Sequence, residues 1–195
     1  MPARWVYGAT DDDDRDAAAQ GLRMVRELYQ MRRPLPVEPE TDGAPRLATR
    51  PFEVGRDEAA WLRVNNRAFA SHPDQSSWTP ADIAAQEAED WFDPEGFLLL
   101  ETDDGMLQGF CWTKVHPVTD VDPAMGEIYV IGVDPDWHGQ GLGRALVLAG
   151  LAHLAHRGLR VGMLYVESNN TPAVHLYRRL GFTIHQVDRA YDSGH

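Results

Sequence analysis

The chain has 195 residues, of which 43% are hydrophobic and 25% are charged, and its formal net charge is −12 at pH 7. This acidity argues against a nucleic-acid-binding surface, which needs clustered Lys and Arg, and the chain has neither an apolar run long enough to cross a bilayer nor a basic-then-apolar leader. We therefore expect a cytoplasmic globular protein, a monomer or weak oligomer, whose partner is a small molecule.

The first 33 residues repeat a pattern found near the end of the chain. In both segments a short apolar strand, a polar loop, a helix and a Gly-apolar pair lead into a final strand. An offset of 160 positions aligns Trp5 with Tyr165, Val6 with Val166, Gly21 with Gly181 and Leu22 with Phe182. The repeat predicts that residues 1–33 are the closing strand, helix and strand of a preceding domain similar to the main one. A helical extension packed on the main domain is the alternative, and the acidic run of residues 11–14 reads as a solvated loop.

A proline-rich stretch divides the chain. Four prolines between positions 34 and 45 alternate with acidic residues, and this composition favours neither a helix nor a strand ladder. We therefore expect residues 34–46 to be a stiff polar linker, which separates residues 1–33 from a main domain formed by residues 47–195.

The main domain alternates strand and helix signals. Thr79 suits an N-cap and Pro80 the first helical position, while Asp104-Gly105 is typical of a tight hairpin turn. The pattern predicts an α/β fold, a mixed and mostly antiparallel sheet with helices on both faces. The expected elements are strand 47–54, helix 57–70, helix 79–91, strands 96–102, 106–116 and 126–133, helix 141–157, strand 161–167, helix 173–180 and strand 182–190.

Polar and aromatic residues gather around the loop of residues 71–77, SHPDQSS, which joins the first two expected helices. This loop is too polar to lie in a core. We therefore take five residues in and beside it as candidate substrate contacts, namely Asn65, Arg67, His72, Gln75 and Trp78.

The most informative stretch runs from Gly126 to Gly158: a β-branched strand that ends at Asp134-Pro135, a loop with glycines at 139, 141 and 143, and a long apolar helix. Glycines let the backbone approach a ligand, and the N–H groups of a helix start attract anions, so a diphosphate is the expected ligand. The spacing fits neither the G-x-G-x-x-G dinucleotide fingerprint nor the P-loop. It fits V-x-P-x-x-[Q/R]-x-x-G-x-[G/A], except that His138 stands at the Gln or Arg position.

That pattern resembles the acetyl-CoA loop of the GNAT N-acetyltransferases, and the order of the expected elements is the GNAT order. Segments such as NRAFASHPDQSSWT, GEIYVIGVDP and LYVESNNTPAVHLYRRLGF resemble the mycothiol synthase family, densely over residues 47–190 and loosely over 1–33. Since that family joins two GNAT domains in tandem, the resemblance implies a GNAT fold preceded by a partial second GNAT-like unit. It also implies transfer of acetyl from acetyl-CoA to the cysteinyl amine of desacetylmycothiol, the last step of mycothiol biosynthesis.

The resemblance further implies which residues hold acetyl-CoA. Backbone groups of Ile131 and Val133 would bind the pantetheine amides and the oxyanion if their strand has an unpaired edge, and Gly132 would allow close approach. Asn170 either caps the helix after SNNTP or touches the coenzyme. The expected coenzyme contacts are Ile131, Gly132, Val133, His138, Gly139, Gln140, Gly141, Leu142, Gly143, Arg144 and Asn170.

Acetyl transfer to an amine needs a base for the ammonium group and a proton for the departing thiolate. By resemblance Glu127, at the start of the central strand, is the general base and contacts the substrate, while Tyr177, on the helix after SNNTP, is the acid. The alternatives are an ordinary charged strand end for Glu127 and core packing for Tyr177. The 160 offset places Ala17 where the acid would stand in the N-terminal copy, so we expect that copy to be inactive.

Two other functions stay open on the sequence. One is a GNAT-shaped module that binds acyl-CoA without turnover, and the other is an enzyme that acetylates another amine, such as a protein N-terminus or an aminoglycoside. Retention of both Glu127 and Tyr177 favours an enzyme, because a binding module needs neither. No metal is expected, since Cys111 is the only cysteine and His153 and His156 have no carboxylate spaced to complete a site.

Overall fold

The computed structural model describes residues 3–38, 47–70 and 77–193. The chain divides into two compact units: unit 1 holds residues 1–33 and 163–195, and unit 2 holds residues 34–162. The division after residue 33 falls where the expected linker begins, and the end of the chain groups with the N-terminal segment. The later part of that linker, residues 39–46, lies outside the described residues.

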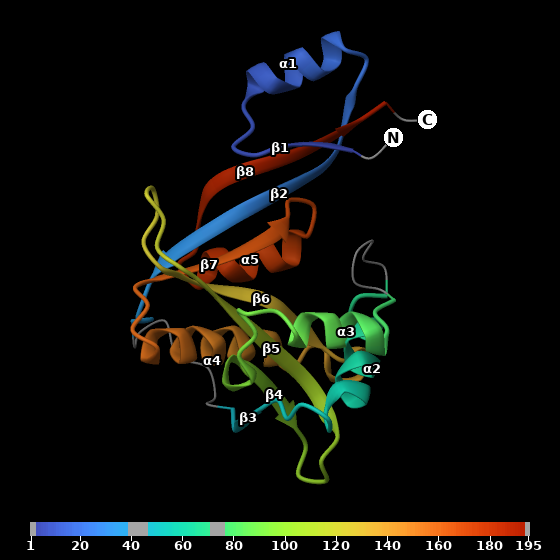
Figure 1. Ribbon diagram of the computed structural model, residues 1–195, viewed down its shortest axis with the longest axis vertical. Coiled ribbons are helices and arrows are strands. Elements are labelled where there is room, and N and C mark those ends of the chain that lie inside the picture. The colour runs from blue at the N-terminus through green and yellow to red at the C-terminus, as the bar shows by residue number, and fades with distance from the viewer. Residues whose placement is uncertain (1–2, 39–46, 71–76, 194–195) are drawn as a thin grey trace. The chain divides into compact units, whose positions relative to one another are not determined.

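Unit 2 is an antiparallel sheet that carries helices on both faces (Figure 1). Its strands lie in the order β6-β5-β4-β3, and Gly105 has a φ of 81° in the turn between β4 and β5, as the Asp-Gly pair predicts. The elements are β3 (Thr49–Pro51), α2 (Glu58–Ala68), α3 (Pro80–Glu87), the 3-10 turn η2 (Pro94–Gly96), β4 (Phe97–Glu101), β5 (Leu107–His116), β6 (Met125–Val133), the 3-10 turn η3 (Pro135–Trp137) and α4 (Leu142–His156).

Helix α3 begins as its sequence predicts but ends early. The hydroxyl and the backbone N–H of Thr79 donate to the Asp82 carboxylate at 2.6 and 2.7 Å, and Pro80 occupies the first turn. The helix ends at Glu87 and not at Trp91. Trp91 therefore lies in an irregular segment, where its ring meets the Tyr129 ring edge-on with the centroids 5.0 Å apart.

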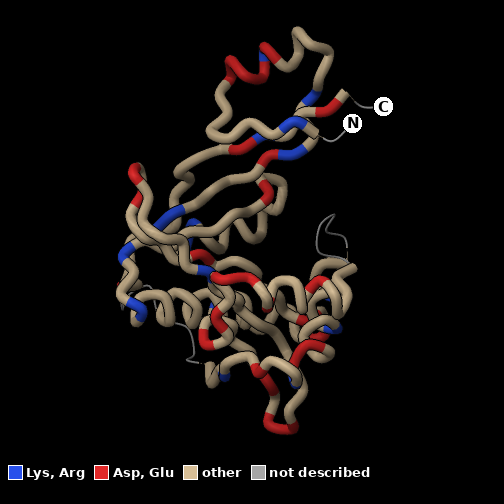
Figure 2. Tube along the Cα trace, viewed as in Figure 1, with Lys and Arg blue, Asp and Glu red and all other residues tan. Residues whose placement is uncertain are grey.

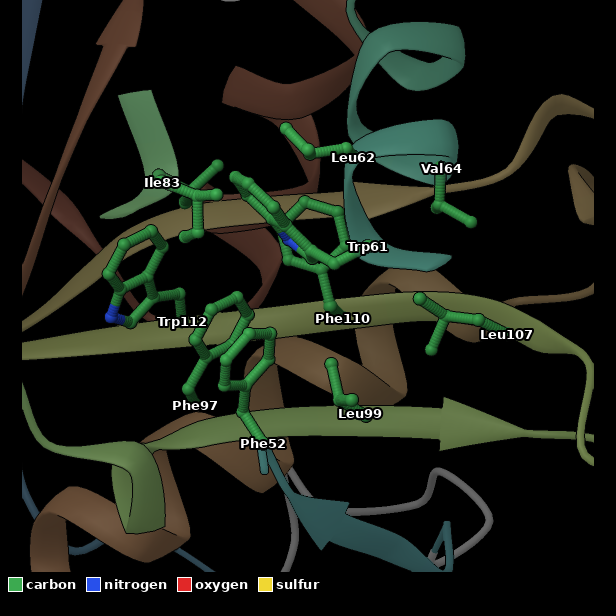
Figure 3. Close-up of a cluster of buried hydrophobic side chains, with 11 residues drawn as sticks. Phe52, Trp61, Leu62, Val64, Ile83, Phe97, Leu99, Leu107, Phe110 and Trp112 are labelled. Carbon is green, nitrogen blue, oxygen red and sulfur yellow. The ribbon is translucent and has the colours of Figure 1, made fainter. Parts of the chain in front are cut away.

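Aromatic side chains fill the space between the sheet of unit 2 and α2 (Figure 3). Trp61 of α2 is fully buried and meets Phe97, Phe110 and Trp112 edge-to-face, with ring centroids 5.5, 5.4 and 5.8 Å apart. This packing fixes α2 on the sheet and with it the residues of its last turn. The buried members of the cluster are Phe52, Trp61, Leu62, Val64, Ile83, Phe97, Leu99, Leu107, Phe110, Trp112 and Val130.

Helix α4 covers the opposite face of this sheet and approaches it closely at Gly150. A Cβ at Gly150 of α4 would lie 2.5 Å from the Cys111 sulfur and 2.7 Å from the Ile128 side chain. Any larger residue at position 150 would therefore force the helix away from β5 and β6. The same packing buries Cys111 completely, and burial raises the pKa of its thiol to about 12.

Unit 1 is a sheet whose strands lie in the order β1-β8-β2-β7, with β8 antiparallel to both β1 and β2. Trp5 of β1 lies opposite Ala190 of β8, and Leu28 of β2 lies opposite Asp188. The elements that belong to unit 1 in whole or in large part are β1 (Arg4–Val6), α1 (Asp11–Ala19), β2 (Arg23–Pro34), β7 (Val161–Glu167), α5 (Thr171–Arg179) and β8 (Thr183–Asp192).

The bounds of several helices and strands agree with the offset of 160 positions. Helices α1 and α5 both span nine residues at this offset, and β2 and β8 begin at Arg23 and Thr183. Gly21 and Gly181 end the two helices with φ angles of 73° and 82°, as helix C-termini favour. In the order β1-β8-β2-β7 the strands of the two segments are interleaved, since the first strand of the N-terminal segment pairs with the last strand of the C-terminal segment.

The acidic run of residues 11–14 begins α1, which corrects the expectation of a solvated loop (Figure 2). Thr10 is the N-cap, and its hydrogen bonds to Asp13 lower the pKa of that carboxyl group. Acidic side chains are favourable at a helix start, where the backbone N–H groups point outward. Asp14 also accepts from the Tyr191 hydroxyl at 2.6 Å and pairs with Arg189 at 2.9 Å, which ties α1 to β8.

Candidate active site

Residues at the end of β6 direct their backbone groups away from β5. The N–H of Asp134 donates to the Gln108 carbonyl at 2.9 Å, and the antiparallel pairing continues from there along β6. Because residues of an antiparallel strand face their partner strand alternately, Ile131 and Val133 turn their N–H and C=O groups toward the other edge of β6. These are the two residues whose backbone groups we expect to meet the coenzyme.

Gly132 lies between these two residues and faces the aromatic cluster. A Cβ at this position would lie 2.8 Å from the Phe110 ring and 3.3 Å from the Cβ of Ala68. Glycine is therefore needed here so that the Phe110 ring and the end of α2 can pack against β6. The coenzyme contact expected of Gly132 stays a prediction.

The candidate loop for the coenzyme leaves β6 through a capped turn. Asp134 is buried and accepts the N–H of Asp136 at 3.0 Å, which begins the turn η3. Gly139 and Gly141 have φ angles of 80° and 78°, and Gly141 is the N-cap of α4. A Cβ added at Gly139, Gly141 or Gly143 would meet no atom within 4 Å. The backbone at the start of α4 therefore borders open space, as binding of a diphosphate requires.

His138 turns back toward β6. Its Nε2 lies 3.0 Å from the carbonyl oxygen of Val133, and since a carbonyl only accepts, the imidazole is the donor. The residue at the Gln or Arg position of the GNAT pattern therefore closes the loop onto the strand that carries the expected pantetheine contacts. Gln140 is exposed, and Leu142 and Arg144 are partly exposed in the first turn of α4.

Arg67, in the last turn of α2, holds the beginning of this loop. Its Nε lies 2.9 Å from an oxygen of Asp134, and a terminal nitrogen lies 2.8 Å from an oxygen of Asp136. The hydrogen bond to Asp134 is the main cause that raises the pKa of the Arg67 guanidinium. The three residues border a cavity of about 110 Å³ that Arg63 and Trp137 also line. The contact found for Arg67 is thus with the loop, and the substrate contact expected of it stays a prediction.

Two other candidate substrate residues make contacts within unit 2. Asn65 is 1% exposed and donates to the side chain of Asn66 at 3.1 Å. The Trp78 ring meets the Trp61 ring edge-on with the centroids 5.5 Å apart, and the Asn66 side chain bonds both the N–H and the C=O of Trp78. A role in substrate binding stays a prediction for Asn65 and Trp78. The remaining two, His72 and Gln75, lie outside the described residues.

Glu127 lies near the start of β6, close to polar side chains of β5. It is 6% exposed, and its Oε2 lies 2.7 Å from Nε2 of His116, the last residue of β5. Lys114, directly opposite Glu127 on β5, has its Nζ 4.0 Å from the centre of the Trp91 ring. One end of the β5–β6 hairpin thus brings a nearly buried carboxylate beside an imidazole and an ammonium group.

A β-bulge in β6 adds Tyr129 to this group of residues. The pairing of β5 with β6 skips Tyr129, which is therefore the extra residue of the bulge. Its hydroxyl donates to the Gln86 side chain of α3 at 3.3 Å, and its ring centre lies 5.2 Å from Nζ of Lys114. Burial is the main cause that raises the pKa of Tyr129, and the charge of Glu127 adds to it.

The sequence indicated Glu127 as a candidate, and its role stays a prediction, but it gave no indication that His116, Lys114 and Trp91 lie nearby. The β5–β6 register depends on residues 117–124, a loop without a recognisable turn type, so the partners of Glu127 could not be read from the chain. Lys114 and His116 follow one another at a spacing of two on a predicted strand, which places them on one face. That alternation was the signal available for both residues.

Tyr177 and Asn170 lie in unit 1. The Tyr177 side chain of α5 is 8% exposed, and its ring meets Phe182 edge-on with the centroids 5.8 Å apart. Asn170 is the N-cap of α5, and its side chain accepts the N–H of Ala173 at 3.3 Å. Of the two roles considered for Asn170, the cap is therefore present. Ala17 stands buried at the position equivalent to Tyr177 in the first copy.

In residues 3–38, 47–70 and 77–193, no group of three or more His, Cys, Asp and Glu side chains is arranged to hold a metal ion. No helix in the same part of the chain is both long and apolar enough to cross a membrane.

Comparison with known proteins gives a consistent result. The sequence pattern of the Acetyltransferase (GNAT) family matches residues 26–182. A protein named mycothiol acetyltransferase from Thermomonospora curvata is 53% identical over 191 residues, which cover 97% of this chain and 62% of that protein. A mycothiol acetyltransferase from Thermobispora bispora is 52% identical over 191 residues, which cover 96% of this chain and 64% of that protein. The chain thus spans less than two thirds of the length of these curated relatives.

A solved structure is similar over nearly the whole chain. The crystal structure of a GCN5-related N-acetyltransferase from Sphaerobacter thermophilus superposes with a TM-score of 0.77 at 26% identity. The match covers 97% of this chain and 58% of that one. The similarity therefore includes the N-terminal strand-helix-strand segment as well as the β6–α4 region.

Proposed function

The chain belongs to the acetyltransferase (GNAT) family, and on this premise we propose that it transfers the acetyl group of acetyl-CoA to the cysteinyl amine of desacetylmycothiol. The observation that carries the choice of acceptor is the identity of about one residue in two, over nearly all of this chain, to proteins named mycothiol acetyltransferase. The proposed reaction would take place in the cytoplasm, in a monomer or weak oligomer.

The coenzyme would lie along the edge of β6 and the start of α4. Its diphosphate would accept hydrogen bonds from the N–H groups of residues 141–144, where Gly141 and Gly143 border open space, with Arg144 as the nearby cation. The pantetheine amides would bond the backbone groups of Ile131 and Val133, which face away from β5. The open space beside Gly139 and Gly141 is the observation that supports this fit.

Glu127 would act as the general base and Tyr177 as the general acid. Glu127 takes a proton from the acceptor ammonium group, and the electron pair of that N–H bond stays on nitrogen, which attacks the thioester carbon. The carbonyl oxygen becomes an oxyanion held by backbone N–H groups at the edge of β6. When the C–S bond breaks, Tyr177 protonates the sulfur, and its phenolate regains the proton that the new amide nitrogen loses.

We also propose that residues 1–33 are the closing part of a first GNAT-like domain. The support is the repeat of helix and strand bounds at an offset of 160 residues, together with the greater length of the curated relatives. Ala17 has no group that could donate a proton, so the first copy would not catalyse the reaction.

The test is to incubate the protein with acetyl-CoA and desacetylmycothiol and to follow the product by mass spectrometry, which locates the acetyl group on nitrogen or sulfur. Glucosaminyl-inositol, which lacks the cysteinyl group, and a peptide N-terminus serve as comparison amines. N-acetylation of desacetylmycothiol alone supports the proposal. Binding of acetyl-CoA without acetylation of any amine would identify a binding module, and a preference for the peptide would identify a different acceptor.

Glu127→Gln is the matched variant for this assay. The amide has nearly the shape of the carboxylate but cannot accept the proton, so the rate should fall by roughly 100-fold or more, most strongly at low pH where the acceptor is protonated. An unchanged pH profile would remove Glu127 from the role of base while leaving the proposed overall reaction untouched.

A further inference from the structure

His116 is the residue that contacts the carboxylate proposed as the base. Its Nε2 lies 2.7 Å from Oε2 of Glu127, and the side chains are 33% and 8% exposed. The two residues stand on neighbouring strands, at the end of β5 and the start of β6, so the backbone ladder sets their separation. The contact is therefore a consequence of the β5–β6 register.

The direction of this hydrogen bond follows from the chemistry of its two groups. An ionised carboxylate only accepts hydrogen bonds, so the shared proton belongs to Nε2 of His116. In the described part of the chain Oε1 of Glu127 accepts no hydrogen bond. One oxygen of the carboxylate is thus held, and the other remains for a ligand.

Lys114 does not replace His116 in this contact. Its position opposite Glu127 would allow an ion pair, yet its ammonium group lies over the Trp91 and Tyr129 rings. Within residues 3–38, 47–70 and 77–193, His116 is the only side chain found bonded to the Glu127 carboxylate. Removal of the imidazole would leave this carboxylate free to rotate.

We propose that His116 is a positioning residue for the acetyl transfer, an inference that rests on the proposed function. The Nε2–H group holds Oε2 and so directs Oε1 toward the acceptor amine. In the step it supports, an N–H bond of the acceptor ammonium group breaks, an O–H bond forms at Oε1, and the electron pair stays on nitrogen for attack on the thioester. His116 takes no proton in this step.

Three variants at position 116 separate the effect of the hydrogen bond that His116 donates from the effect of filling the space with a side chain. Gln at position 116 can place an amide N–H where Nε2 stands, whereas Asn places it where Nδ1 stands and Leu has no donor. With kcat and KM measured for acetyl-CoA and the acceptor, His116→Gln should keep the wild-type kcat within about threefold. His116→Asn and His116→Leu should lose roughly tenfold or more in kcat, since misplacing a reacting group by about 1 Å costs up to 100-fold. His185→Leu, at an exposed histidine of β8, is the control for loss of an imidazole.

The outcomes decide the proposal even if one variant fails to fold. Equal kcat in all variants would overturn it, and so would a His116→Gln variant as slow as His116→Asn, because the donated bond would then not be what matters. If His116→Leu is unfolded, the comparison of Gln with Asn still decides. A large rise in the acceptor KM at unchanged kcat would make His116 a binding residue and would also overturn it.

A measurement without turnover separates this proposal from the proposed function. In ¹⁵N-histidine spectra of the wild-type protein, the neutral ring of His116 should carry its hydrogen on Nε2, and a bare Nε2 would overturn the inference. If the wild-type protein acetylates no amine, the proposed function fails, while the spectrum still reports on the pair. If it acetylates another amine, the same variants are compared with that amine.

Discussion

The guanidinium of Arg67 lies 2.9 Å from the carboxylate of Asp134, so the last turn of α2 is tied to the residue that follows β6. Asp134 in turn caps the turn that leads into the candidate coenzyme loop. Trp61 fixes α2 on the sheet, so the packing of the aromatic core determines where Arg67 lies. Arg67 thus connects the packing of the core to the position of the loop.

Arg67→Ala should weaken acetyl-CoA binding by at most about fivefold with little change in kcat, because solvent-exposed ion pairs of this kind hold a loop only weakly. The measurement is the KM for acetyl-CoA, with Arg63→Ala as the control, because Arg63 lies one turn earlier on α2, is exposed and has no ion pair with a described residue. A rise in the KM for the acceptor instead would support the predicted contact of Arg67 with the substrate.

Tyr177→Phe should lower kcat by roughly 100-fold while acetyl-CoA affinity changes less than about twofold. The variant keeps the ring, which packs against Phe182, and removes only the hydroxyl proposed to protonate the thiolate. Calorimetric titration with acetyl-CoA and steady-state rates measure the two quantities. Tyr7→Phe, at a residue 74% exposed, is the control. A loss of acetyl-CoA affinity in Tyr177→Phe would contradict the role of Tyr177 as general acid and would indicate that it binds the coenzyme.

Two glycines of the coenzyme loop should respond in opposite directions to the same substitution. Gly141→Ala should lose roughly 1–2 kcal/mol of stability, because φ at this position is 78°, a region costly for any residue with a Cβ. Gly143→Ala should gain up to about 1 kcal/mol, since the added methyl group meets no atom within 4 Å and alanine favours a helix. Urea unfolding without coenzyme measures both. A loss in both variants would show that the loop has another conformation.

Glu87→Gln should stabilise the protein at neutral pH by roughly 1 kcal/mol. Burial raises the pKa of Glu87, and neighbouring Glu58 raises it further, while one of its oxygens is buried without a partner among the described residues. Because the folded pKa lies above the unfolded value of about 4.5, this group favours folding below that pH and loses its contribution as pH rises through the folded pKa.

The measurement for Glu87 is the free energy of unfolding between pH 4 and 7 in the wild type, in Glu87→Gln and in the control Glu89→Gln, which changes an exposed residue of the same segment. The wild-type protein and the control should lose stability more steeply with rising pH than Glu87→Gln. Parallel curves for all three would contradict a raised pKa.

Local signals predicted much of the fold. The start of α3 follows from Thr79 and Pro80, and the strand, loop and helix around Gly141 follow from spacing. Contacts between residues far apart in the sequence could not be predicted. The ion pair of Arg67 with Asp134 joins the end of a helix to the end of a strand, and the contact of His116 with Glu127 depends on the register of β5 and β6. The prediction of a loop for the acidic run was wrong because Thr10 is an N-cap. Acidic side chains that follow an N-cap stabilise the start of a helix.

Removal of residues 1–33 should unfold unit 1, because β8 pairs with β1 on one side and β2 on the other. Removal of residues 1–7 alone should be tolerated, since it takes away only the edge strand β1. Hydrogen exchange of the β8 amides measures the difference, with unit 2 as the internal reference. Retained protection of β8 after the longer deletion would contradict this expectation.

The interleaved order β1-β8-β2-β7 has a consequence for synthesis on the ribosome. Unit 2 is one continuous stretch of sequence and can fold as soon as it emerges from the ribosome. The strand of Trp5, in contrast, can pair with β8 only after Ala190 has been translated. The segment around Trp5 is thus translated well before the strand with which it pairs. A chaperone that shields this segment in the nascent chain would have to stay bound until β8 has emerged.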